Sequence, residues 1–229
     1  MFYYYGTKKQ LAKYYPKPKK DVIVEPFCGA AQYSLKYWKK DVFLYDIDEL
    51  IIRLWQYLQS ATEQDVKSLP RFKAGDDIRD FKLSEGESLF CGYMAGISFA
   101  KRNIVSSMAS KTINNDILKI SKNLYKIKHW QVKRLDYKEI PNIDATWFID
   151  PPYIKGGHKY RYSNKNIDYD FLAEWCKTRS GDVIVCENAD AGWLDFLPIV
   201  QINGNANHKK IEAMWTNFKT EYHNIKEIF

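Results

Sequence analysis

The sequence predicts an α/β fold in which helices pack on a mostly parallel sheet. Its 229 residues suit one sizeable domain with an insert. Val22-Ile-Val24 and Trp147-Phe-Ile149 are continuous apolar runs of the kind found in buried parallel strands. Each run stops at an acidic residue followed by proline. Polar groups therefore gather at the carboxyl ends of strands, where open α/β sheets hold their ligands.

The individual elements follow from hydrophobic periodicity and from the residues that stop each run. Pro16 and Pro18 should end an N-terminal helix, and Asp48 suits the N-cap of a later one. Residues 154–166, rich in glycine, lysine and tyrosine, predict a mobile loop. The expected elements are helices over Lys9–Tyr15, Gln32–Trp38, Glu49–Leu58, Asp116–Lys126 and Asp168–Thr178, strands over Val22–Val24, Val42–Tyr45, Gln131–Leu135, Trp147–Ile149 and Asp182–Cys186, a short helix or turn over Trp193–Phe196, and last strands in the tail around Glu212–Asn217.

Residues 69–125 break the alternation of strands and helices. This stretch is polar and basic, with a run rich in serine, asparagine and lysine over 106–115. We therefore predict a main domain over 1–68 and 126–229 with an insert over 69–125. The insert is either a recognition module or an ordinary surface subdomain. Its side chains suited to base edges or phosphates are Lys101, Arg102, Asn103, Lys111 and Asn114.

Asp150-Pro-Pro-Tyr153 follows the most apolar strand and predicts the reactive centre. An amine conjugated to an aromatic ring is a poor nucleophile, because its lone pair is delocalised. Asp150 and the carbonyl of Pro151 could accept hydrogen bonds from such an amine and expose its lone pair, while Pro152 stiffens the turn. Tyr153 could stack on a base flipped out of a duplex. The alternative is a strand end with a tight turn, since short motifs are often coincidental.

A ligand pocket is predicted beside this motif. The strand, Gly29 turn and helix that begin at Val22 form the nucleotide-binding unit of doubly wound folds. Asp46 ends the second strand, where a ribose is usually held, and Asp136 after the third could accept a hydrogen bond from an adenine. No glycine-rich phosphate cradle is present, so we expect a nucleoside without pyrophosphate. The aromatic N-terminus is expected to form a wall over the pocket.

Composition limits the class of protein. Hydrophobic residues make up 45% and aromatic residues 16%, as in a globular chain. The net charge of +7 fits a polyanionic partner, although a merely soluble basic surface would look the same. No membrane-spanning run and no signal peptide are visible, so we expect a cytoplasmic protein without membrane contact. Four cysteines without Cys-x-x-Cys spacing predict reduced buried thiols, and four scattered histidines suggest no metal site.

Three segments together resemble a known family. Tyr5-Gly-Thr-Lys8 is similar to its N-terminal Gly-Gly-Lys motif, Val24-Glu-Pro-Phe-Cys-Gly-Ala30 to its Glu-Pro-Phe-x-Gly-x-Gly cofactor motif, and Asp150-Pro-Pro-Tyr153 to its catalytic motif. The sequence thus resembles the N6-adenine-specific DNA methyltransferases typified by the bacterial DNA adenine methylase. The order of cofactor motif, recognition insert and catalytic motif is that of their alpha group. The resemblance covers nearly the whole chain except the insert.

The resemblance implies a Rossmann-like S-adenosylmethionine-dependent methyltransferase fold with a small target-recognition subdomain. It implies direct methyl transfer to N6 of a flipped adenine in double-stranded DNA, with S-adenosylhomocysteine as product and no metal. The expected catalytic residues are Asp150, Pro151, Pro152 and Tyr153. The cofactor is assigned to Tyr4, Tyr5, Gly6, Lys8, Glu25, Pro26, Phe27, Cys28, Gly29, Asp46, Ile47, Asp136, Tyr137 and Asp150. DNA contacts are expected from the five polar residues of the insert and from Lys155, His158, Lys159 and Arg161 in the loop.

Two departures from the family pattern limit what can be carried over. Ala31 stands where the family usually has a second glycine, which is harmless only if its φ is negative. The insert also lacks the usual Asn-Arg-x-Gly-Tyr-Asn-Gly stretch, so no target sequence is implied. N4-cytosine methylation and an inactive nucleic-acid-binding module remain alternatives. A monomer or weak dimer in a bacterial or phage-infected cell is expected, and a cognate restriction endonuclease is a partner that the family allows.

Overall fold

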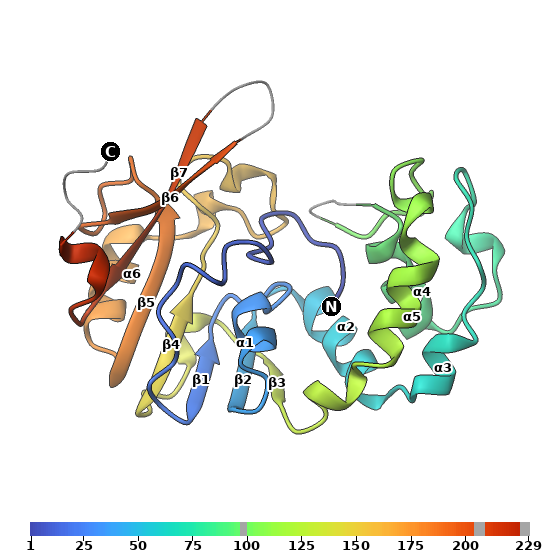
Figure 1. Ribbon diagram of the computed structural model, residues 1–229, viewed down its shortest axis with the longest axis horizontal. Coiled ribbons are helices and arrows are strands. Elements are labelled where there is room, and N and C mark those ends of the chain that lie inside the picture. The colour runs from blue at the N-terminus through green and yellow to red at the C-terminus, as the bar shows by residue number, and fades with distance from the viewer. Residues whose placement is uncertain (97–99, 204–208, 225–229) are drawn as a thin grey trace.

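A seven-stranded sheet forms the centre of the molecule. The computed structural model describes residues 1–96, 100–203 and 209–224. The strand order is β3-β2-β1-β4-β5-β7-β6, in which the first five strands are parallel and β7 is antiparallel to both neighbours (Figure 1). The predicted α/β, Rossmann-like fold is confirmed. The strands are β1 (Val22–Glu25), β2 (Asp41–Asp46), β3 (Gln131–Arg134), β4 (Ala145–Ile149), β5 (Gly181–Asn188), β6 (Leu197–Asn203) and β7 (Lys209–Thr216).

The two faces of the sheet support separate hydrophobic cores. Side chains of a strand alternate between faces, so Trp147 and Ile149 of β4 pack with α6 (Tyr169–Lys177), whereas Phe148 packs on the opposite face. Phe148 stacks on Tyr33 of α1 (Gln32–Lys36) at a ring-centroid distance of 4.1 Å. All five residues of β4 are buried, which explains why this strand reads as an unbroken apolar run.

The insert is a group of helices beside α2 (Glu49–Ser60), on the right of Figure 1. As predicted, Asp48 caps α2, because its Oδ1 accepts the backbone N–H of Leu50 at 3.0 Å. The buried residues of α4 (Glu85–Met94) and α5 (Ile113–Ser121) belong to the same core as α2. The short α3 (Glu63–Lys67) packs on α5. The helices of the insert therefore share one core with the sheet domain.

The structure corrects two element predictions. Lys9–Tyr15 forms consecutive turns instead of a helix, since Ala12 donates to the Lys8 carbonyl but Tyr14 already donates three residues back, to Leu11. The helix predicted over Asp116–Lys126 is α5, which begins earlier, at Ile113, and ends earlier, at Ser121. Just past its end, the Asn123 side chain donates to the carbonyl of Lys119. Of the two alternatives predicted for Trp193–Phe196, the structure has the turn: the chain bends there, and the Phe196 N–H donates to the Leu194 carbonyl at 2.9 Å.

Ala31 has a left-handed backbone. Its φ is 43° and its ψ is 47°, and it directly precedes α1. A Cβ in this region costs about 1–2 kcal/mol relative to glycine. An alanine at position 31, where the family pattern has glycine, therefore lowers the stability of the fold. Two contacts offset this strain: the Ala31 N–H donates to the Cys28 carbonyl at 2.7 Å, and the Ala31 side chain is buried in the core.

We expect Ala31→Gly to raise the free energy of unfolding by about 1 kcal/mol, because it relieves this strain at the cost of some entropy in the unfolded chain. Urea denaturation measures it. The neighbouring Ala30→Gly is the matched control. Ala30 is buried without a positive φ, so the same change there should destabilise. Equal losses from both substitutions would show that Ala31 carries no strain.

Candidate functional site

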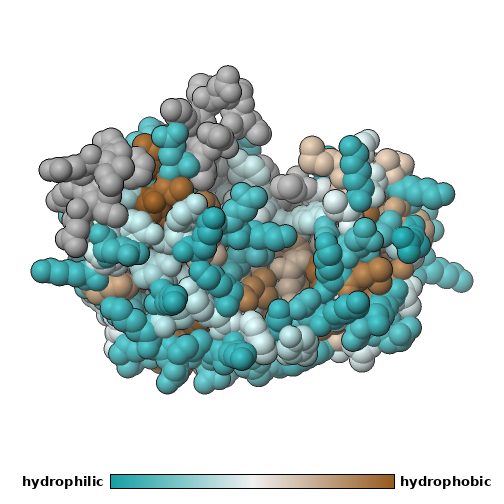
Figure 2. All heavy atoms as spheres, in the orientation of Figure 1, coloured by the Kyte–Doolittle hydropathy of each residue, from teal (hydrophilic) through white to brown (hydrophobic). Residues whose placement is uncertain are grey.

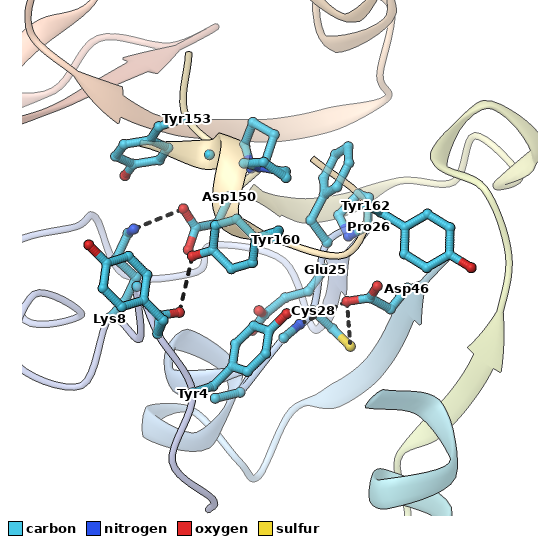
Figure 3. A pocket seen from close by; sticks show the side chains of 18 of the residues that line it. Tyr4, Lys8, Glu25, Pro26, Cys28, Asp46, Asp150, Tyr153, Tyr160 and Tyr162 are labelled. Atoms are coloured by element: carbon cyan, nitrogen blue, oxygen red, sulfur yellow. Dashed lines mark hydrogen bonds and ion pairs between the residues drawn. The ribbon is translucent and has the colours of Figure 1, made fainter. Parts of the chain in front are cut away.

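A cavity of about 350 Å³ opens at the carboxyl ends of the parallel strands. In the space-filling view, the surface is notched at its upper centre, between the part over the sheet and the part over α4 and α5 (Figure 2). The N-terminal segment and the loop after β4 line the cavity together with the strand ends (Figure 3). Every residue assigned from the sequence to the cofactor or to the reactive motif lines it: Tyr4, Tyr5, Gly6, Lys8, Glu25, Pro26, Phe27, Cys28, Gly29, Asp46, Ile47, Asp136, Tyr137, Asp150, Pro151, Pro152 and Tyr153.

Asp46 holds one wall of the cavity in place. Its Oδ2 accepts the N–H of Gly29 at 3.1 Å and its Oδ1 accepts that of Asp48 at 2.9 Å, so one carboxylate joins the turns after β1 and β2. Burial raises the pKa of Asp46 to about 6, against the two backbone N–H groups that lower it. At neutral pH the group is a carboxylate able to accept hydrogen bonds from hydroxyl groups.

An aromatic and acidic corner lies beside Asp46. The rings of Phe27 and Tyr137 are 5.2 Å apart, and Asp136 precedes Tyr137. The Oδ1 atom of Asp136 accepts the backbone N–H of Lys138 at 3.0 Å, which fixes the carboxylate at the end of β3. A flat polar heterocycle would find apolar contact and a hydrogen-bond acceptor here.

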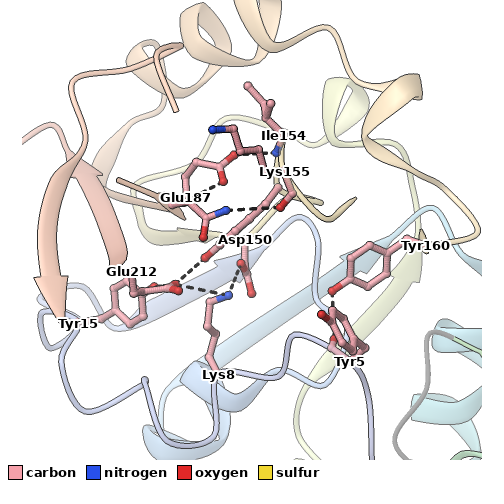
Figure 4. A network of polar contacts seen from close by, with 11 residues as sticks. Tyr5, Lys8, Tyr15, Asp150, Ile154, Lys155, Tyr160, Glu187 and Glu212 are labelled. Carbon is pink, nitrogen blue, oxygen red and sulfur yellow. Dashed lines mark hydrogen bonds and ion pairs between the residues drawn. The ribbon is translucent and has the colours of Figure 1, made fainter. Parts of the chain in front are cut away.

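A buried ion cluster forms the opposite wall (Figure 4). The Nζ atom of Lys8 lies 2.9 Å from Oδ1 of Asp150 and 3.5 Å from Oε1 of Glu212. The Tyr153 hydroxyl donates to Oε1 of Glu212 at 2.5 Å, and Lys8 lies 4.5 Å above the Tyr153 ring. Tyr15 donates to the same Oε1. Burial alone would lower the pKa of Lys8, but the two carboxylates raise it, so Lys8 stays charged. Burial raises the pKa of Asp150 against the opposing effect of Lys8.

Two segments close over the cavity. Tyr160, in the loop after β4, donates to the backbone carbonyl of Tyr5 at 3.1 Å. A Cβ at Gly6 would lie only 2.3 Å from that hydroxyl, and Gly6 has a φ of 73°, so glycine is required at this crossing. Arg161 pairs with Asp48 at 3.3 Å. The loop thus bridges the N-terminus and the end of β2.

The residues predicted to bind DNA are dispersed. Lys155 lines the cavity mouth and pairs with Asp190. The Asn114 side chain accepts a hydrogen bond from the Phe72 N–H and donates one to the Phe72 carbonyl, each at 2.9 Å, so its amide is occupied within the fold. Lys101 donates to Ser88. The exposed residues among the predicted set are Lys101, Arg102, Asn103, Lys111, Lys155, His158, Lys159 and Arg161.

Sequence reasoning missed Glu212, Tyr160 and Tyr162, which also line the cavity. Glu212 begins the Glu-Ala-Met-Trp-Thr-Asn stretch of the tail, and a glutamate within the apolar run from Ile211 to Trp215 was the signal available. Its antiparallel pairing with Asn188, the last residue of β5, brings it to the carboxyl ends of the parallel strands. That pairing is not visible in the sequence.

The described residues contain no group of three or more His, Cys, Asp or Glu side chains arranged to hold a metal ion. Cys28, Cys91, Cys176 and Cys186 are buried free thiols. Burial raises the pKa of the Cys28 thiol, which makes it a poor nucleophile. Within the same residues, no helix has the length and apolar character needed to cross a membrane.

Comparison with known proteins agrees with the sequence motifs. Residues 4–81 match the model of the D12 class N6 adenine-specific DNA methyltransferases, and this match over about a third of the chain bears out the resemblance seen in the motifs. It includes the Lys8 and Glu25-Pro-Phe segments and ends before Asp150. No curated protein gives a significant match. Among solved structures, an rRNA methyltransferase, aviRa from Streptomyces viridochromogenes, is 8% identical with a TM-score of 0.37, over 86% of this chain and 79% of that one.

We expect Lys8→Met to lower the free energy of unfolding by about 3 kcal/mol near pH 8, because Asp150 and Glu212 would remain buried without their cation. The pKa of Asp150 would then rise further above its unfolded value. A carboxyl with a raised folded-state pKa stabilises at low pH and loses that contribution as the pH rises. The deficit should therefore shrink toward pH 5.

Denaturation of wild type and variant between pH 5 and pH 8 measures this effect. Lys20→Met is the matched control, because Lys20 forms an exposed pair with Asp144 at the other end of β4. It should change stability little at any pH. A Lys8→Met deficit that is independent of pH would contradict the buried-charge explanation.

Proposed function

We propose that the protein transfers a methyl group from S-adenosylmethionine to the N6 amine of adenine in double-stranded DNA. The observation that carries the proposal is the position of Asp150 and Pro151. They end the central strand β4 and line the same cavity as Asp46 and the aromatic corner. A site for a nucleoside and a site for an aromatic amine therefore adjoin. The family match supports a DNA methyltransferase.

The cavity residues fit S-adenosylmethionine. Asp46 would accept hydrogen bonds from the ribose hydroxyls, and Asp136 with Phe27 and Tyr137 would hold the adenine. Gly29 permits close approach, since a Cβ there would meet the Tyr4 ring at 3.2 Å. When bound, the donor would supply an electrophilic methyl group on its sulfonium sulfur. A new bond from N6 to this methyl carbon would replace the carbon–sulfur bond, whose electron pair stays on sulfur, and N6 would lose a proton to solvent.

The chain contributes mainly position and charge to this reaction. Lys8 engages one oxygen of Asp150, and the other can accept a hydrogen bond from the substrate amine. Pro151 offers a carbonyl fixed by the proline that follows. The hydrogen bond from the Tyr153 hydroxyl to Glu212 and the contact of Lys8 with the ring fix the orientation of Tyr153. In this orientation its ring would stack on a flipped base. The hydrogen bonds draw the nitrogen toward tetrahedral geometry and expose its lone pair.

The DNA would be held by two groups of exposed residues, one in the loop after β4 and one in the insert. The loop residues Lys155, His158, Lys159 and Arg161 and the insert residues Lys101, Arg102, Asn103 and Lys111 are exposed and carry mainly positive charge. The insert over 69–125 would read the target sequence. N4-cytosine methylation uses an equally conjugated amine and is the second candidate for the same residues. No described feature favours the inactive binding module, because the lysine and carboxylate of the reactive centre are paired and the cavity is formed.

We expect label from S-adenosylmethionine to enter N6-methyladenine when unmethylated genomic DNA is the substrate. Nucleoside analysis of the product identifies the base and the acceptor atom. Asp150→Ala should reduce transfer about a hundredfold or more, while DNA and S-adenosylhomocysteine, whose sulfur is neutral, still bind. Asp144→Asn, which removes a carboxylate just before β4 begins, should retain activity. Label in N4-methylcytosine would keep the mechanism and change the base. Full activity of Asp150→Ala would exclude the role proposed for this residue.

We also expect cofactor affinity to fall as the pH drops below about 6. The pKa of Asp46 is about 6, and the ionised form is the one that accepts ribose hydroxyls. Binding to the carboxylate would lower its pKa in the complex, so the affinity is complete above pH 6 and is lost below it. Calorimetry with S-adenosylhomocysteine at several pH values measures this dependence.

In Asp46→Asn, the affinity at pH 7.5 should fall about tenfold and the dependence near pH 6 should disappear. Glu25→Gln is the control. Burial raises the pKa of Glu25 to about 8, and its Oε1 accepts the Ser34 N–H, so this substitution should leave the change near pH 6 intact. A pH dependence that survives Asp46→Asn would assign it to another group.

A further inference from the structure

Glu212 is the one carboxylate of the ion cluster that the sequence motifs do not account for. Only 3% of the residue is exposed, and it lines the cavity from β7. A buried carboxylate of this kind is costly unless it is paired, and Glu212 has three partners on a single oxygen. The hydroxyls of Tyr15 and Tyr153 are neutral donors, so among these three partners Lys8 is the one that carries a positive charge.

The charges of the cluster do not cancel. Lys8 carries one positive charge, and Asp150 and Glu212 carry one negative charge each, which leaves −1. Without Glu212, Lys8 would neutralise Asp150 at a separation of 2.9 Å. The cluster beside the methyl-transfer position would then present no net charge to a ligand, whereas Asp46 and Asp136 lie at the nucleoside end of the cavity. Among the described residues that line the cavity, the other lysine is Lys155, which is paired with Asp190.

We propose that Glu212 is a positioning residue that offsets the charge of Lys8, so that the methyl-transfer site keeps a net negative charge for the cationic sulfonium and for the amine that becomes positive as it is methylated. This inference rests on the proposed function and deepens it. Lys8 has a structural task, since it ties the N-terminal segment to β4, but alone it would repel the donor. Glu212 removes that conflict while its oxygen also fixes the Tyr153 ring.

The proposal predicts a difference between two ligands of nearly the same shape. S-adenosylmethionine carries a sulfonium charge, and S-adenosylhomocysteine has a neutral thioether sulfur. A charge effect acts on the first ligand alone, whereas loss of packing or of Tyr153 position acts on both. The ratio of the two dissociation constants therefore separates electrostatics from structure.

Glu212→Gln is the decisive variant, because glutamine keeps an oxygen that accepts from both tyrosine hydroxyls and removes only the charge. We expect its affinity for S-adenosylmethionine to fall on the order of tenfold relative to its affinity for S-adenosylhomocysteine. Calorimetry at pH 7.5 with each ligand measures the ratio. Tyr15→Phe removes one hydrogen bond to the same Oε1 without changing charge, so it should leave the ratio unchanged.

The double variant Lys8→Met with Glu212→Gln covers the case in which the single variant does not fold. Without Lys8 the pKa of Asp150 rises, so the double variant is measured above pH 8 as well; there the ionised carboxylate has no neighbouring cation, and the preference for S-adenosylmethionine should return to at least the wild-type ratio. Equal weakening of both ligands by Glu212→Gln, or no change in either, would overturn the proposal. Wild-type protein that binds neither ligand would instead overturn the proposed function, and the inference with it.

Discussion

The ion pair between Lys8 and Asp150 is the contact on which the site depends. Lys8 comes from the N-terminal segment and Asp150 from the end of β4, so one 2.9 Å contact ties the start of the chain to its central strand. Glu212, in the antiparallel strand β7, contacts the same ammonium group of Lys8. Three stretches far apart in sequence thus meet at one ammonium group. Because the cluster is buried, each partner is costly to remove alone.

The parallel part of the fold could be predicted from the sequence because its signals are local. A buried strand such as β4 is an apolar run, and its end is marked by the acidic residue and prolines that stop it. The Asp48 cap is likewise a matter of neighbouring residues. The turns over 9–14 were predicted as a helix for the same reason, since local periodicity contains nothing about the burial of Lys8 and Tyr15 that tertiary contacts impose.

The cavity residues divide along the same line. Asp46, Asp136 and Asp150 each lie at or just past the end of a parallel strand. Parallel strands bring their carboxyl ends to one edge, so the proximity of these residues follows from the fold class. Glu212 lies within an antiparallel strand. Its position depends on the register in which β7 pairs with β5, and a shift of one residue would turn it to the other face. Its place in the site could be found only from the structure.

Ala31 shows why the site and the stability of the fold have to be considered together. The turn between β1 and α1 must bend sharply to leave Gly29 open to the cavity, and the bend places Ala31 at a positive φ. The Gly29 N–H is then held by Asp46, the carboxylate proposed to bind the ribose. One turn therefore combines the backbone strain at Ala31, the opening to the cavity at Gly29 and the hydrogen bond that orients Asp46. A change that relaxes the turn acts on the cofactor site through the hydrogen bond between Gly29 and Asp46.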